Sequence, residues 1–115
     1  SRPGLTNPSL PELLALDRDG FNARFRRHPA KRAKRGGLLR NAAVALGNSG
    51  DPAAVPPLVA ALRDEEPLVR AHAAWGLGQL GGDEARIALD AALQSERDPD
   101  VIEEIHQALG DLSTA

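Results

Sequence analysis

Cysteine is absent from this chain of 115 residues. Its absence excludes a disulfide framework, and it excludes iron–sulfur clusters and zinc sites that the chain would hold through cysteine. No apolar run reaches the ~18 residues that a membrane span requires. No secretory signal opens the chain, so we expect a cytoplasmic protein without membrane contact. Methionine is absent too, and we expect the chain to have been processed or to be cut from something longer.

Aromatic and β-branched residues are scarce. The chain has two Phe, one Trp and no Tyr, although 42% of its residues are hydrophobic. The apolar residues are mainly Ala and Leu, which are strong helix formers, whereas β-branched and aromatic residues favour strands. The composition therefore predicts an all-α protein in which small side chains allow helices to approach closely.

The first third of the chain is expected to cap a larger unit. Residues 1–8 are predicted to be a linker. Residues 9–37 are predicted to form N-terminal capping helices and a basic turn, with one helix over about 10–16 and a second after Asp19. Pro29 is expected to end that second helix or to start the turn, which finishes in a pair of glycines.

A repeat follows over residues 38–115. The pair Leu46-Gly47 recurs as Leu77-Gly78 and as Leu109-Gly110, at spacings of 31 and 32 residues. A period of this length built from two short helices indicates a helical solenoid, here of about two and a half helix pairs in a single domain. The expected helices cover 38–48, 52–63, 67–80, 84–95 and 99–112. Because proline is costly inside a helix, Pro56-Pro57 predicts that the second one begins nearer Val55 or has a bent first turn.

The net charge of −2 hides a separation of charge along the chain. Between Gly20 and Gly50 there is no acid, whereas residues 51–115 hold 13 acids against four arginines. Eight cations without acids among them repel one another unless an anion offsets them, and that anion is either the acidic half of the fold or an external phosphate backbone. The cations are Arg24, Arg26, Arg27, Lys31, Arg32, Lys34, Arg35 and Arg40.

The positions of the acids favour the external anion. Asp51, Asp64, Asp83 and Asp98 fall at expected helix starts, where capping and the helix dipole account for them. We therefore expect these acids to serve helix ends and not to pair with residues 24–40. The cationic segment is predicted to contact nucleic acid, and a solvated basic face remains the alternative.

Three neighbouring features could add to such a surface. Asn41 can hydrogen-bond a base or a phosphate, or it is ordinary helix surface. Arg70 could join the same surface, although a salt bridge to an acid such as Asp64 is slightly favoured. Trp75 shares a face with His72 and Gln79 and could stack on an unpaired base, but a lone Trp at this spacing more often packs between repeats.

Catalytic and metal-binding motifs are not found in the sequence. The histidines are His28, His72 and His106, and none has a partner on a convincing metal-binding face. There is no glycine-rich phosphate loop. The stretch 47–51 is typical of a helix stop followed by an N-cap. The sequence therefore predicts no self-contained active site.

Two sets of residues resemble known families. Leu68-Val69-Arg70, Ala73-Ala74-Trp75 and Leu77-Gly78-Gln79-Leu80-Gly81 resemble HEAT-like repeats of the short bacterial type. A more specific match consists of Leu10 to Asp17, Phe21 and Phe25, the run Lys31-Arg32-Ala33-Lys34-Arg35, and the stretch from Leu39-Arg40-Asn41 to Ala45-Leu46-Gly47-Asn48. This set resembles the C-terminal part of the epoxyqueuosine reductase family over about residues 9–110.

The resemblance implies a short HEAT-like solenoid that docks tRNA. In that family the enzyme reduces epoxyqueuosine in the tRNA anticodon loop with cobalamin and two [4Fe-4S] clusters, held by domains N-terminal to this region. By position, Lys31 to Arg35 and Arg40-Asn41 would meet the anticodon stem-loop. The implied partners are that stem-loop and the catalytic domain, and a monomer is expected. A HEAT-repeat scaffold for protein–protein interaction is the alternative function.

Overall fold

The computed structural model describes the backbone of residues 29–114 and the side chains of residues 33–113. The two expected capping helices and the linker lie outside the described residues. All elements in the described part are helical, which confirms the all-α prediction. They are α3 (Pro29–Asn48), the 3-10 turn η2 (Pro52–Ala54), α4 (Val55–Ala61), α5 (Pro67–Leu80), α6 (Asp83–Ser95) and α7 (Pro99–Thr114).

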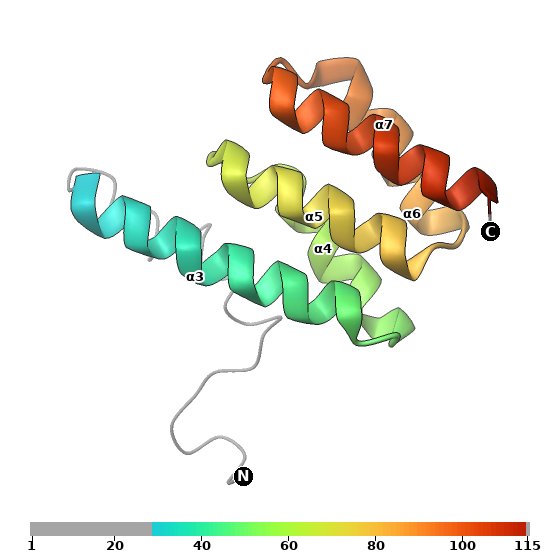
Figure 1. The fold of residues 1–115 in the computed structure, drawn as a ribbon, viewed down its shortest axis with the longest axis horizontal. Coiled ribbons are helices and arrows are strands. Elements are labelled where there is room, and N and C mark those ends of the chain that lie inside the picture. The colour runs from blue at the N-terminus through green and yellow to red at the C-terminus, as the bar shows by residue number, and fades with distance from the viewer. Residues whose placement is uncertain (1–28, 115) are drawn as a thin grey trace, which may run out of the picture.

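The helices form two layers. Helices α3, α5 and α7 lie side by side in one layer, and α4 and α6 form a second layer that covers one face of the first (Figure 1). Each helix of the first layer is followed in the chain by a helix of the second, except α7, after which the described residues end. This alternation is the stacked helix-pair arrangement of a helical-repeat solenoid, as the 31- and 32-residue spacings predicted.

Helix α3 is longer than predicted. It begins at Pro29 and not at Leu38, so the segment expected to be a basic turn is helical. Pro29 occupies the first position, where the missing N–H costs nothing, and Ala, Lys and Arg then favour the helix. Gly36 and Gly37 lie inside this helix.

The link between α3 and α4 follows the predicted stop and cap. Gly50 adopts a φ of 69°, and the Asp51 carboxylate accepts a hydrogen bond from the Ala53 N–H at 2.9 Å. Helix α4 then begins at Val55, which confirms the first of the two predictions made from Pro56-Pro57. Both prolines stand in the first turn, where backbone N–H groups have no intrahelical acceptor, so the N–H that proline lacks costs the helix no hydrogen bond.

The repeated Leu-Gly pair marks where helices of the first layer cross. A methyl group at Gly47 would lie 2.7 Å from the Cα of Gly76, and one at Gly78 would lie 2.9 Å from the Cβ of Ala108. Since real Cβ atoms do not approach so closely, glycine is needed at both crossings. At Gly110 a methyl group would meet nothing within 4 Å, as no helix follows α7 in the part of the chain that the structure describes.

The apolar core lies between the two layers. Each helix longer than one turn contributes at least one fully buried aliphatic side chain, and alanines fill the closer contacts. Burial of such a side chain typically contributes about 1.5–3 kcal/mol. The large buried aliphatic side chains are Leu39, Leu58, Val69, Leu77, Leu89, Val101 and Ile105.

Candidate nucleic-acid interface

Five of the eight cations of the predicted interface belong to α3. Lys31 and Arg32 lie in its first turns, Lys34 is exposed and Arg40 is half-buried. Arg24, Arg26 and Arg27 lie outside the described residues. Since α3 holds no acid, its surface-exposed cations have no neutralising partner on the same helix.

Arg35 is the exception, because its side chain is inside the fold. Only 1% of the residue is exposed, and its guanidinium donates to the Asp64 carboxylate at 2.6 Å. Asp64 also accepts a hydrogen bond from the Glu66 N–H at 2.8 Å, at the start of α5. The prediction that the acids of the repeats serve helix ends and do not pair with residues 24–40 is therefore wrong for Asp64, which does both.

The surroundings of Arg35 act on its ionisation in opposite directions. Burial lowers the pKa of its guanidinium, while the charges of Glu66 and Glu65 oppose that effect. The guanidinium stays protonated even so, because arginine does not lose its proton in proteins. Arg35 therefore enters the fold as a cation, held by the acids at the turn between α4 and α5.

The spacing of apolar residues in the sequence already indicates that Arg35 is buried. Arg35 precedes Leu39, Ala42 and Leu46 at the spacing of an apolar stripe, and all three are buried. Extending the stripe back by one turn places Arg35 on the core side of α3. The helix predicted from the sequence began at Leu38 and so did not include this position.

Arg40 and Asn41 are brought together at the surface. The Arg40 Nε–H donates to Oδ1 of Asn41 at 3.2 Å. The hydrogen bond uses the amide oxygen of Asn41 and leaves its NH₂ group as a donor. Both side chains therefore present donors, which suits the oxygens of a phosphate group.

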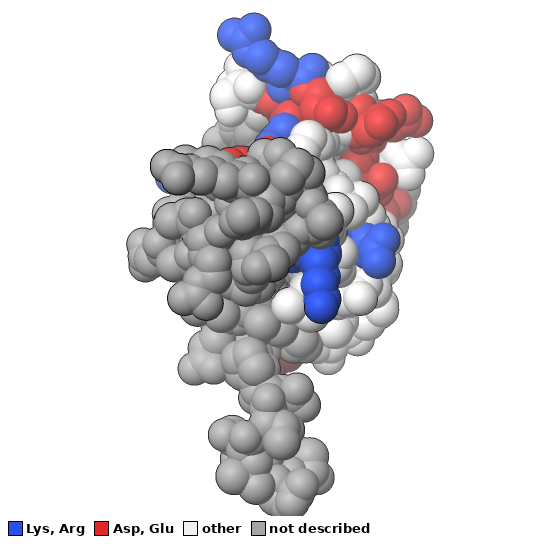
Figure 2. All heavy atoms as spheres, turned by 90° about the vertical axis from the view of Figure 1, so that its left-hand side faces the viewer, with Lys and Arg blue, Asp and Glu red and all other residues white. Residues whose placement is uncertain are grey.

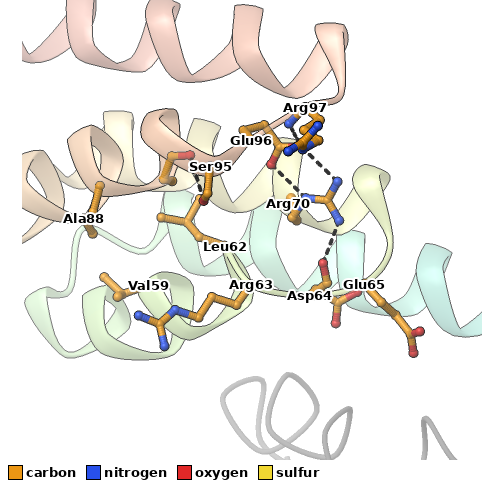
Figure 3. Close-up of a pocket in the computed structure, with 12 residues that line it drawn as sticks. Val59, Leu62, Arg63, Asp64, Glu65, Arg70, Ala88, Ser95, Glu96 and Arg97 are labelled. Carbon is orange, nitrogen blue, oxygen red and sulfur yellow. Dashed lines mark hydrogen bonds and ion pairs between the residues drawn. The ribbon is translucent and has the colours of Figure 1, made fainter.

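Arg70 is held by two turns of the chain. Its Nε and Nη2 atoms donate to the two Glu96 oxygens at 2.8 and 3.0 Å, and its Nη1 donates to the Asp64 carbonyl at 2.7 Å. Figure 3 shows its guanidinium between Glu96 and Asp64. The favoured alternative for Arg70, a salt bridge, is thus observed, with Glu96 as the acid.

Glu96 is placed to remain ionised. Burial raises its pKa, but hydrogen bonds from Arg70, Asp98 and Arg97 and the charge of Arg70 outweigh that effect, so the pKa is lowered from 4.5. The donors are the Arg70 side chain and the backbone N–H groups of Asp98 and Arg97, at 3.0 and 3.2 Å for the latter two. Glu96 therefore ties the α6–α7 turn to the start of α5.

A groove of about 650 Å³ lies on the α4 and α6 side of this network. Its apolar wall includes Val59, Leu62 and Ala88, and the exposed residues Arg63 and Arg97 line it on either side (Figure 3). Arg70 lines the groove together with the acids Asp64, Glu65 and Glu96. The groove does not include the exposed cations of α3.

Charge is unevenly distributed over the described surface. Figure 2 views the end of the molecule at which α3, α5 and α7 begin. Red acidic atoms gather over the upper part of this face, and blue basic atoms lie below them beside the grey segment, with a further basic group at the top edge. The separation of charge in the sequence thus becomes a separation across the surface.

Trp75 packs between repeats, which is the second of the two roles predicted for it. A methyl group at Gly47 would lie 2.8 and 3.2 Å from two atoms of the Trp75 ring, so the ring covers the backbone of α3. Trp75 and His72 are half-buried, and Gln79 is exposed. These side chains lie on α5, the helix between α3 and α7.

Residues 29–114 lack the features of two other classes of site. No three His, Asp or Glu side chains gather there in a way that could hold a metal ion. Among the same residues, no helix combines the length and the apolar character needed to cross a membrane.

The chain is similar in sequence to a repeat family and to several known proteins. Residues 30–110 match the family of HEAT repeats. The chain is 32% identical over 108 residues to the epoxyqueuosine reductase of Bacillus anthracis, covering 93% of this chain and 28% of that protein. It is 34% identical over 104 residues to the enzyme of the same name from Listeria monocytogenes, covering 90% and 27%. The chain therefore spans little more than a quarter of these relatives.

A solved structure gives the same similarity in three dimensions. It is a crystal structure of epoxyqueuosine reductase with a tRNA-Tyr epoxyqueuosine-modified tRNA stem loop. The TM-score is 0.72 at 31% sequence identity, over 90% of this chain and 28% of that one. The similarity to epoxyqueuosine reductases therefore extends from sequence to fold.

Proposed function

This chain belongs to the HEAT-repeat family, and we propose that it is the tRNA-docking module of an epoxyqueuosine reductase. The module is non-catalytic by itself and holds the anticodon stem-loop for the last step of queuosine biosynthesis. The observation that carries the proposal is the cationic α3 on a fold shared with an epoxyqueuosine reductase that binds a tRNA stem loop. Phosphate contacts by Lys and Arg supply most of the affinity in such complexes.

The proposed interface lies along α3. Arg40 and Asn41 supply donors on its exposed side. Arg35 and Arg70, also predicted from the sequence, support this surface from within, because both donate to Asp64. The surface contacts are assigned to Arg24, Arg26, Arg27, Lys31, Arg32, Lys34, Arg40 and Asn41.

The remaining parts of the proposal concern the parent enzyme. Cobalamin and two [4Fe-4S] clusters belong to its catalytic part, and this chain has no cysteine with which to ligate either cluster. The chain's partners are the tRNA stem-loop and that catalytic part. We place the protein in the cytoplasm as a monomer.

Binding of the chain to a tRNA anticodon stem-loop over a salt series tests the proposal. The test variant carries Lys31→Ala, Arg32→Ala and Lys34→Ala. The matched control carries Arg63→Ala, Arg86→Ala and Arg97→Ala, which removes the same charge from exposed positions outside α3. The slope of log K against log salt should fall by roughly 2 to 3 in the test variant, because each lost phosphate contact removes about 0.7–0.9. The control should keep the parent slope.

An equal fall of the salt slope in both triple variants would contradict the assignment of the RNA contacts to α3. Absence of RNA binding by the folded chain at low salt would overturn the docking function. The protein-interaction scaffold would then be the better interpretation, and the groove between Arg63 and Arg97, with its partly apolar wall, would be its candidate peptide site.

A further inference from the structure

A small hollow lies on the exposed face of the first helix layer. Its volume is about 290 Å³, and it is lined by Val44 of α3, Ala71, His72 and Trp75 of α5, and Glu104 of α7. Ligand pockets usually occupy about 300–1,000 Å³, so this one has room for a single small group. All three helices of the layer contribute to it.

The Trp75 ring is fixed on one side and reaches the hollow on the other. Gly47 leaves room for the ring against α3, since a methyl group there would lie 2.8 Å from it. The half-buried ring also lines the hollow. An aromatic ring held in this way is a stacking surface for a planar ligand, and it needs little ordering when the ligand binds.

The polar groups of the hollow favour a ligand that donates hydrogen bonds. Nδ1 of His72 lies 2.9 Å from the Leu68 carbonyl oxygen, which can only accept, so Nδ1 donates its proton to that oxygen. The Glu104 carboxylate, which also lines the hollow, is an acceptor. A carboxylate accepts from the amino group of cytosine, and adenine and guanine also carry amino groups, whereas uracil presents carbonyl oxygens in that place.

The neighbouring cation favours a nucleotide over a neutral aromatic compound. Arg40 precedes Val44 by one turn of α3, so the two share a face of the helix. A phosphate at Arg40 and a base in the hollow would thus be adjacent parts of one strand. We propose that this hollow binds one unpaired nucleobase that carries an amino group, stacked on Trp75 and hydrogen-bonded to Glu104.

This inference rests on the proposed RNA docking, and the chain offers a direct probe for it. Trp75 is the only Trp and there is no Tyr, so tryptophan emission reports this ring alone. The ligand is a tRNA anticodon stem-loop in which each loop base is replaced in turn by an abasic residue. The intact stem-loop should quench the emission. One abasic position should restore it and weaken binding by about 5- to 150-fold, the range for one stacked base.

Two variants separate stacking from packing. Trp75→Phe keeps a ring against Gly47 and should retain most of the affinity, whereas Trp75→Leu should lose about as much as the abasic RNA. Glu104→Gln gains a donor and should reduce the preference for an amino-bearing base over uracil at that position. Circular dichroism shows that each variant is folded.

The outcomes distinguish the two proposals. The chain could bind the stem-loop in a salt-dependent way while Trp75 emission stays unchanged and no abasic position weakens binding. In that case the hollow is not a base site, and the docking function stands. If the folded chain binds no RNA at low salt, the docking function fails and this inference fails with it.

Discussion

The guanidinium of Arg35 lies 2.6 Å from the carboxylate of Asp64, and both side chains are almost completely buried. The pair joins α3 to the α4–α5 turn across 29 positions of the chain. Asp64 accepts from Arg70 through its carbonyl oxygen, so the two arginines meet at one residue. The cationic helix is thereby attached to the repeats through an acid that the repeats supply.

Removing one member of this pair is expected to be costly. Asp64→Asn leaves the Arg35 charge buried without its carboxylate and should lower the free energy of unfolding by about 3–5 kcal/mol, as measured by urea denaturation. Adding Arg35→Met should recover most of that loss, since an apolar side chain fits the buried position. Arg86→Ala, at an exposed site, should change stability by less than about 0.5 kcal/mol. Equal losses in the single and double variants would show that the pair is not coupled.

Two glycines of α3 should respond oppositely to the same substitution. Gly47→Ala places a methyl group 2.7 Å from the Gly76 Cα and should destabilise the fold by about 1–3 kcal/mol through overpacking. Gly37→Ala meets nothing within 4 Å and should stabilise it by about 0.5–1 kcal/mol, because alanine is the better helix former. Urea midpoints of the two variants provide the measurement. A stabilising Gly47→Ala would contradict the close crossing of α3 and α5.

Periodic features of the sequence predicted the repeats well. Helix α5 has the predicted bounds, and the Leu-Gly spacing corresponds to helix crossings at Gly47 and Gly78. Such features follow from short-range spacing, which a helix converts directly into faces. Pro29 was ambiguous, because proline suits both the residue after a helix and the first residue of one.

The buried role of Arg35 depended on a partner that no local pattern reveals. Asp64 has the sequence context of a capping residue, and it does accept a backbone N–H there. Only the packing of α3 against the α4–α5 turn brings its other oxygen to Arg35. Of the predicted contact residues, the fold thus separates Arg35 and Arg70, which hold turns in place, from Lys34, Arg40 and Asn41, which are accessible.

Stability should depend on pH through Glu96. Its pKa is lowered from 4.5 in the folded chain, so the stabilisation that it gives is complete above pH 4.5 and is lost as pH falls through the folded-state pKa. Glu96→Gln should cost about 1.5–3 kcal/mol at pH 7, where Arg70 loses a charged acceptor. The difference between parent and variant should shrink as the pH of the urea titrations falls below 4.5. A difference independent of pH would contradict this, and Asp90→Asn at an exposed site is the control.

Arg40 and Asn41 should affect RNA binding in different ways. Arg40→Ala removes one cation and should lower the slope of log K against log salt by about 0.7–0.9. Asn41→Ala removes the acceptor of the Arg40 Nε–H but no charge, so it should weaken binding without changing the slope. Arg86→Ala makes the same change of charge on α6 and should leave both quantities near the parent values. Stem-loop titrations at four salt concentrations separate these effects. Equal slopes for Arg40→Ala and Arg86→Ala would mean that net charge, and not a local contact on α3, governs the binding.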